Sequence, residues 1–114
     1  MNLKDYQKLC QRTAKRFGGR EKEIMTYGLG LAGEAGDVAG CIKKTVSHSD
    51  DQKAGIKENL GDTLWYVAMI CNFYDWNLED VMKENIDKLA KRYPKGFVTK
   101  AAKRNNTRVD WMEK

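Results

Sequence analysis

Histidine and proline are both scarce in this sequence. It contains one histidine, His48, and one proline, Pro94. With a single histidine, a histidine-based nucleophilic mechanism has little support. A single proline permits long, uninterrupted helices, because proline disrupts a helix interior.

Cysteine and long apolar runs are also limited. The three cysteines, Cys10, Cys41 and Cys71, form no CxxC pair, and each lies in an apolar helical context. We expect them to be core thiols in a reducing cytoplasm. The longest apolar run, from Leu64 to Cys71, is too short to span a bilayer, and no N-terminal segment resembles a signal peptide. The sequence therefore predicts a soluble, cytoplasmic protein with no membrane partner.

Composition indicates one small globular domain. Apolar residues make up 41% and charged residues 32% of the 114 residues. A core of this size would benefit from oligomerisation. The net charge is +5, and the positive excess follows Lys88. We expect a domain over 1–97 and a basic C-terminal tail over 98–114, which is either a solvated end or a segment that holds phosphate.

Hydrophobic periodicity predicts four helices and no strand. Apolar residues spaced three and four apart place these helices at 3–17, 22–46, 53–74 and 78–92. Gly18 and Gly19 should end the first helix, Asn77 and Asp80 should cap the last, and Pro94 should end it. The pattern predicts an all-α fold that resembles a four-helix bundle.

The second and third helices have unusual compositions. The second contains five glycines, Gly28, Gly30, Gly33, Gly36 and Gly40. We expect its first half to be irregular, with the helix proper beginning between Tyr27 and Leu31, although close approach of another helix could offset the cost of glycine. The third is apolar almost all round, so it should be central and have neighbours on several sides. We expect a second subunit to cover part of it.

Two acidic pairs are the most informative feature. Glu34 and Asp37 lie on the second helix, and Glu58 and Asp62 on the third. Spacings of three and four residues put each pair on one helical face. Glu58 and Asp62 extend the apolar stripe that contains Trp65, so they should point inward, where carboxylates need a partner such as a hard divalent cation. The pattern indicates metal-assisted chemistry on phosphates; the alternative is four ordinary surface acids.

A second group of polar residues lies on the fourth helix. Asn85, Lys88 and Arg92 follow one another at spacings of three and four. Their amide and cationic groups suit phosphate oxygens, although a solvated helix face has the same pattern. Trp65 either stacks on a nucleobase or belongs to the core.

In this order, the segments GLAGEAGD, NLGDTLWYVAMI and NIDKLAKRYPKGF resemble the MazG-like nucleoside triphosphate pyrophosphohydrolases of the all-α NTP pyrophosphatase superfamily. The resemblance covers roughly residues 25–97. It implies a MazG-type fold and a homodimer or homotetramer with sites near subunit boundaries. It also implies Mg²⁺-dependent cleavage of (d)NTPs between the α and β phosphates, which releases a monophosphate and pyrophosphate. Mn²⁺ is a possible substitute for Mg²⁺.

The family pattern is an E-x-x-E pair, an E-x-x-D pair and an N-x-x-K segment. The resemblance implies that Glu34 and Asp37 form the first pair, that Asp62 is the final aspartate, and that Asn85 and Lys88 bind substrate. Arg92 and Trp65 are further candidates for substrate binding.

The chain departs from this pattern at two positions. Asp37 stands where glutamate is usual, and Asn59 occupies the glutamate position of E-x-x-D, with Glu58 one residue earlier. We expect Glu34, Asp37 and Asp62 to bind metal and Glu58 to be a ligand or general base. Asn59 could ligate through its amide oxygen. We favour Glu58, because Asn59 lies further round the helical wheel from Asp62.

Two other functions fit parts of the sequence. One is a nucleotide-binding or regulatory helical module whose catalysis is weakened by Asn59. The other is a helical interaction protein that binds nucleic acid through its basic tail. It leaves the acids unexplained, and nothing here resembles a helix-turn-helix or a zinc finger, so we do not expect a nucleic-acid partner.

Overall fold

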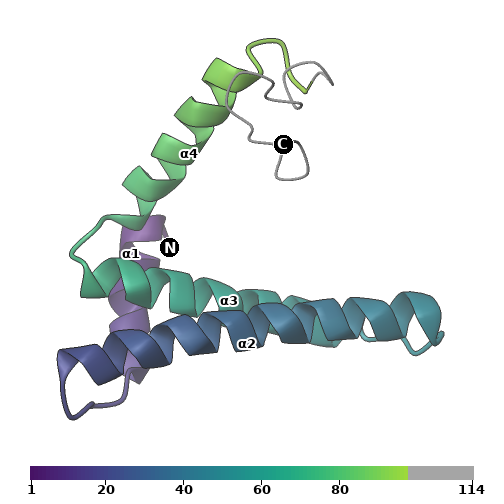
Figure 1. The fold of residues 1–114 in the computed structure, drawn as a ribbon, viewed down its shortest axis with the longest axis horizontal. Helices are drawn as coiled ribbons and strands as arrows, with labels where there is room; N and C mark the ends of the chain where they lie inside the picture. The colour runs from purple at the N-terminus through teal and green to yellow at the C-terminus, as the bar shows by residue number, and fades with distance from the viewer. Residues whose placement is uncertain (98–114) are drawn as a thin grey trace, which may run out of the picture. The chain divides into compact units, whose positions relative to one another are not determined.

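The computed structural model describes residues 1–97, which form four α-helices and one 3-10 turn, with no strand among them (Figure 1). These elements are α1 (Leu3–Cys10), η1 (Gln11–Thr13), α2 (Arg20–Ser47), α3 (Lys53–Phe73) and α4 (Leu78–Arg92). The predicted all-α class is confirmed. The chain divides into two compact units, Met1–Glu79 and a second that begins at Asp80, and each is described by itself. The predicted tail over 98–114 lies outside the described residues.

A capping box starts α1. The Asn2 side-chain oxygen accepts a hydrogen bond from the Asp5 amide at 2.8 Å, and the Asp5 carboxylate accepts one from the Asn2 amide at 3.4 Å. These bonds satisfy backbone donors that the first turn leaves without helical partners.

The end of α1 corrects the predicted helix over 3–17, because the helix stops at Cys10 and Ala14 is already extended. The Thr13 hydroxyl donates to the Cys10 carbonyl at 3.2 Å and accepts from the Trp65 indole nitrogen at 2.9 Å. Ala14 and Phe17 pack against the core without being helical. Their spacing therefore reflects tertiary packing rather than a helix.

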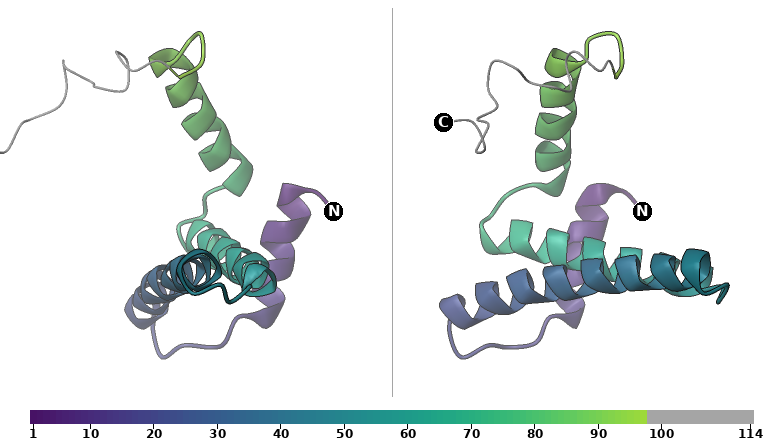
Figure 2. Two further views of the ribbon diagram at one scale, coloured as in Figure 1. Left: turned by 90° about the vertical axis from the view of Figure 1, so that its right-hand side faces the viewer. Right: turned by 45° about the vertical axis from the view of Figure 1, so that its right-hand side comes forward.

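Helices α2 and α3 run antiparallel and lie side by side, as Figures 1 and 2 both show. The predicted irregularity in the first half of α2 was wrong, because the helix is continuous from Arg20 through all five glycines. Tyr27, its one fully buried residue, anchors that half in the core. Gly30 allows the close approach to a neighbouring helix that the sequence left open, since the ring of Tyr66 lies directly against it.

The core lies where α1 packs against the C-terminal part of α3. Its buried members are Cys10, Tyr27, Ala68, Met69, Cys71 and Leu78. The prediction of core thiols is confirmed for Cys10 and Cys71, while Cys41 is partly buried, and all three are free. This cluster is small for a chain of this length, so much apolar surface remains uncovered.

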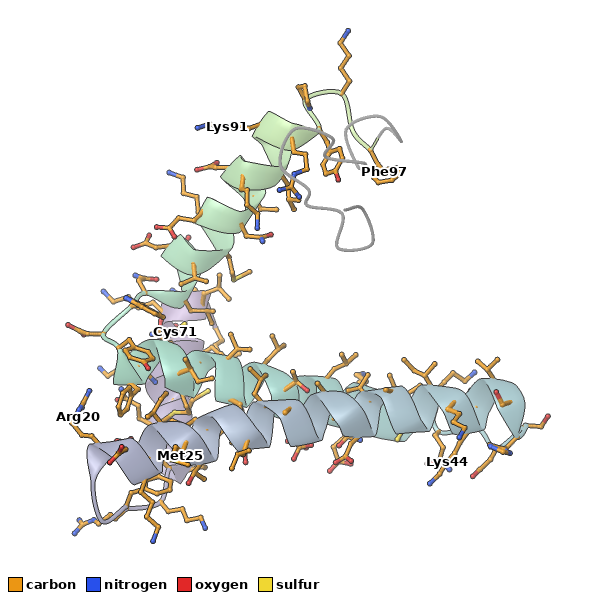
Figure 3. All side chains as sticks on the ribbon, viewed as in Figure 1. Arg20, Met25, Lys44, Cys71, Lys91 and Phe97 are labelled. Atoms are coloured by element: carbon orange, nitrogen blue, oxygen red, sulfur yellow. The ribbon has the colours of Figure 1, made fainter. Side chains whose placement is uncertain are left out.

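The N-terminal half of α3 is much more open than the sequence suggested. Leu60 is 48% exposed and Leu64 is 54% exposed. Figure 3 shows mostly carbon side chains projecting along one edge of the α2–α3 pair, whose ends can be found from the labels of Met25 and Lys44 on α2. Only the C-terminal part of α3 therefore has the neighbours on several sides that were predicted. No helix within residues 1–97 is long and apolar enough to cross a membrane.

Helix α4 has the predicted bounds. The Asn77 side-chain oxygen accepts a hydrogen bond from the Glu79 amide at 2.9 Å, which confirms Asn77 as a cap. The helix ends at Arg92, two residues before Pro94. Proline disfavours helical geometry in the residue before it, which explains the end.

Candidate functional site: an acidic surface on helices α2 and α3

Two close contacts determine how α2 and α3 are aligned. Gly30 lies against the Tyr66 ring, and a methyl group at Gly55 would lie 3.2 Å from the Cys41 sulfur. In an antiparallel pair, four residues forward from Gly30 correspond to four residues back from Tyr66. The register set by both contacts therefore places residue 34 opposite residue 62.

This register brings the two predicted acidic pairs together. Glu34 is partly buried, while Asp37, Glu58 and Asp62 are exposed. The pKa of Glu34 is raised above its ordinary value, first by desolvation and then by repulsion from Asp62, Asp37 and Glu58. All three other acids thus act on Glu34, so the four carboxylates form one acidic surface on α2 and α3.

The predicted inward orientation of Glu58 and Asp62 was wrong, since both side chains are exposed. A helical wheel places these acids on the stripe that continues to Trp65. The residues of α3 that pack into the core begin at Trp65, so the stripe is covered only beyond these two acids. They therefore face solvent in the single chain and interact with Glu34 from the edge of the helix pair.

Asn59 lies closer to the helix interface than the wheel suggested. It is partly buried, and its amide nitrogen donates a hydrogen bond to the Cys41 sulfur at 3.7 Å. Side chains lean toward the N-terminus of their own helix, which in this antiparallel pair carries Asn59 and Cys41 toward each other. The bond occupies the amide nitrogen and leaves the amide oxygen as the group that could approach a cation. Nothing in the sequence pattern signalled the contact with Cys41.

The acidic surface is not a preformed coordination shell. Within residues 1–97, no three His, Cys, Asp or Glu side chains are arranged to hold a metal ion. The donor set nevertheless fits Mg²⁺, which prefers carboxylate and other hard oxygen ligands. The repulsion that raises the pKa of Glu34 is also the kind of electrostatic cost that a bound divalent cation relieves.

Trp65 lies near the acids but is packed against the core. Its ring makes edge-to-face contacts with Tyr27 and Tyr66, with centroid distances of 6.0 and 5.0 Å. Its indole nitrogen donates to the Thr13 hydroxyl. Since Trp65 is partly buried, part of its surface remains open. Its role as a stacking platform stays a prediction.

The predicted phosphate-binding residues belong to the second unit. Asn85 and Lys88 are exposed on α4, and Arg92 is partly buried, with its guanidinium 5.9 Å from the centroid of the Tyr93 ring. Their spacing puts them on one side of the helix. This unit is described by itself, so their role toward the acids also stays a prediction.

Comparison with known proteins places the chain in a family. The model of the MazG nucleotide pyrophosphohydrolase domain matches residues 22–97, a range that contains both acidic pairs and α4. A gene 37 protein of Mycobacterium phage L5 is 35% identical over 75 residues, which cover 61% of this chain and 66% of that protein. The uncharacterized protein YvdC of Bacillus subtilis strain 168 is 32% identical over 73 residues, which cover 55% of this chain and 69% of that protein.

No solved structure matches the chain. The chain thus matches only part of the length of these relatives, 66% of the phage protein and 69% of YvdC. The family match extends over more than half of this sequence and coincides with the segments that carry the acids. The chain belongs to the MazG nucleotide pyrophosphohydrolase domain family.

Proposed function

We propose that this protein is a Mg²⁺-dependent nucleoside triphosphate pyrophosphohydrolase, which cleaves (d)NTPs between the α and β phosphates to give a monophosphate and pyrophosphate. The observation that carries the proposal is the helix register that places Glu34 opposite Asp62, so that four carboxylates share one surface of α2 and α3. Desolvation and then repulsion from these neighbours raise the pKa of Glu34. Membership of the MazG family supports the nucleotide substrate.

The acidic residues have two proposed roles, metal ligand and general base. Glu34, Asp37 and Asp62 would hold Mg²⁺, with Mn²⁺ as a substitute, and the Asn59 amide oxygen is a possible neutral ligand. When bound, the cation neutralises phosphate charge and lowers the pKa of a coordinated water. Glu58 is exposed and would act either as a further ligand or as a general base.

The phosphate end of the substrate needs cations and donors. Lys88 supplies a compact positive charge, Arg92 a planar fork of N–H donors, and Asn85 an amide. These groups would stabilise the charge that develops on the departing pyrophosphate. Trp65 could stack on the base through its open surface.

The experiment is a panel of canonical and modified nucleoside triphosphates incubated with Mg²⁺ or Mn²⁺, with the products separated by ion-exchange chromatography. We expect equal amounts of monophosphate and pyrophosphate, and none when EDTA is present. Asp62→Ala should abolish turnover but leave the helical circular dichroism spectrum unchanged, because its side chain is exposed. Release of orthophosphate and a diphosphate would contradict cleavage between the α and β phosphates.

A second candidate function is a nucleotide-binding module without turnover. It is favoured by the uncharged Asn59, whose amide nitrogen is engaged by Cys41. Triphosphate binding in calorimetry, with no product from any member of the panel, would identify this function instead.

A further inference from the structure

We propose that the first unit carries a second ligand site, in the groove between α1 and the turn that follows α3. The groove has a volume of about 270 Å³, and its charged and aromatic lining includes Lys4, Lys8, Asp75 and Trp76. None of the four acids of the α2–α3 surface lines it. Its side chains suit a small anion that carries a planar heteroaromatic ring, as a nucleoside monophosphate does. The inference does not depend on the proposed activity.

The walls of this groove are held in place by hydrogen bonds. The side-chain nitrogen of Gln7 donates to the Asn72 side-chain oxygen at 2.9 Å and to the Trp76 backbone carbonyl at 2.7 Å. The Gln7 side-chain oxygen accepts from the Leu78 amide at 2.8 Å, and Asn72 donates to the Gln7 carbonyl at 3.0 Å. These bonds tie α1 to a segment more than sixty residues later. A ligand would therefore meet a largely preformed site and would lose little affinity to ordering it.

One wall of the groove offers uncompensated positive charge. Lys4 and Lys8 are one helical turn apart on the same face of α1, and both are exposed. In the part of the chain that the structure describes, the one ion pair joins Lys53 and Asp51, so neither groove lysine is neutralised by direct pairing. Two ammonium groups at this spacing can bind the oxygens of one phosphate.

The opposite wall offers an aromatic surface. Trp76 is 53% exposed, and its ring stacks on Tyr74 with a centroid distance of 4.7 Å and an interplanar angle of 26°. Asp75, between them, has a φ of 59°, in the left-handed region that a non-glycine residue rarely adopts. An exposed indole beside a groove is a suitable platform for a planar ring.

The remaining polar groups favour a base over a simple anion. The Asp75 carboxylate can accept hydrogen bonds from ring or exocyclic N–H groups, and the Asn77 amide, which also lines the groove, can donate or accept. The negative charge of Asp75 disfavours a ligand that consists only of an anion. A nucleotide places its phosphate at the lysines and its base at Trp76, so it uses both walls.

The test is isothermal titration calorimetry of the full chain in buffer that contains EDTA. The protein carries Asp62→Asn, which disables the acidic surface. The three probes are a nucleoside monophosphate, the matching nucleoside and inorganic phosphate. We expect the monophosphate to bind more tightly than either fragment, and its affinity to fall as salt is added. The double variant Lys4→Ala/Lys8→Ala should lower the affinity for the monophosphate about tenfold. The matched control Lys43→Ala/Lys44→Ala, on exposed lysines of α2, should not.

Tryptophan substitutions test the aromatic wall. Trp76→Ala should weaken the monophosphate about tenfold and leave phosphate binding unchanged, whereas Trp76→Phe should retain most of the affinity. Inorganic phosphate that binds as tightly as the monophosphate would overturn the ring-bearing class. Monophosphate binding that is absent, or is unaffected by loss of both groove lysines, would overturn the site itself. Because the titration contains no divalent cation, neither outcome depends on whether the enzyme hydrolyses triphosphates.

Discussion

At the scale of single residues, Glu34 concentrates the electrostatics of the candidate site. It is the one partly buried member of the four acids, and its pKa is raised first by desolvation and then by repulsion from the other three. A carboxyl group with a raised pKa binds its proton more tightly in the folded than in the unfolded chain. In metal-free protein it therefore favours folding at low pH, and this contribution is lost as the pH rises through the raised pKa.

This pH dependence gives the first prediction. Glu34→Gln cannot ionise, so it should flatten this part of the stability profile and be more stable than the unmodified chain near neutrality. Urea denaturation in EDTA, followed by circular dichroism at a series of pH values, measures the difference. Glu84→Gln, an exposed acid on α4, is the control and should follow the unmodified chain. Parallel profiles for the unmodified chain and Glu34→Gln would refute the coupling.

The second prediction distinguishes Glu58 from Asn59. Glu58 acts on the pKa of Glu34, whereas the amide nitrogen of Asn59 is bonded to Cys41. We therefore expect Glu58→Gln to be nearly as damaging as loss of Asp62 and to lower the Mg²⁺-dependent rate by roughly 10²–10⁴-fold. Asn59→Asp should change the Mg²⁺ concentration for half-maximal rate very little. Full activity in Glu58→Gln, or a clearly lower Mg²⁺ requirement in Asn59→Asp, would reverse the assignment.

At the scale of elements, the tighter of the two contacts that align α2 with α3 is at Gly30. The ring of Tyr66 occupies the space that a side chain at Gly30 would need, while no atom of the described residues lies within 4 Å of a methyl group at Gly33. Both glycines lie inside the same helix, where alanine is intrinsically favoured over glycine. The two positions should therefore respond to the same substitution in opposite directions.

The third prediction follows from this contrast. Gly30→Ala must displace the Tyr66 ring and should cost about 1–3 kcal/mol of unfolding free energy. Gly33→Ala should be neutral or stabilise by up to about 1 kcal/mol, because it lowers the entropy of the unfolded chain. Thermal and urea denaturation of the two single variants measures both effects. Equal stabilities would mean that the helices are not aligned through Gly30.

Some helix boundaries could be predicted from sequence because their causes are local. The bounds of α4 follow from the Asn77 cap and from Pro94, and those of α3 from apolar periodicity. The end of α1 could not, because the bond between Thr13 and Trp65 joins residues 52 apart. The five glycines of α2 likewise gave no sign that the helix is continuous, since the contact of Gly30 with Tyr66 joins two different helices.

The same distinction applies to the candidate site. Spacing alone was enough to predict that two acidic pairs meet on neighbouring helices. It could not predict their exposure, because a helical wheel orders residues around one axis and does not place the next helix. Asn59 therefore proved more buried than Glu58, against the expectation from the wheel. The contact between Cys41 and Asn59 could not be predicted either, since a cysteine on an apolar face is most simply read as a core residue.

At the scale of the whole molecule, the described residues leave an unusual amount of apolar surface uncovered. Besides Leu60 and Leu64, the exposed large apolar side chains of α2 are Met25, Leu29, Ile42 and Val46. Three of the glycines in α2, Gly28, Gly36 and Gly40, meet no side chain of the described residues, although each lowers helix stability. A neighbouring subunit that packs closely on these helices would account for both features.

The last prediction is therefore a homo-oligomer, either a dimer or a dimer of dimers. Leu60→Glu/Leu64→Glu places two charges on the exposed apolar face of α3 and should shift the protein to a monomer with lower stability, because charge is costly to bury in an interface. Lys57→Glu, an exposed position on the same helix, is the matched control and should keep the oligomer. Sedimentation velocity and light scattering measure the mass of each variant at a protein concentration of about 1 μM. A stable monomer of the unmodified chain under those conditions would show that α2 and α3 tolerate this apolar surface without a partner, and the glycines of α2 would then need another explanation.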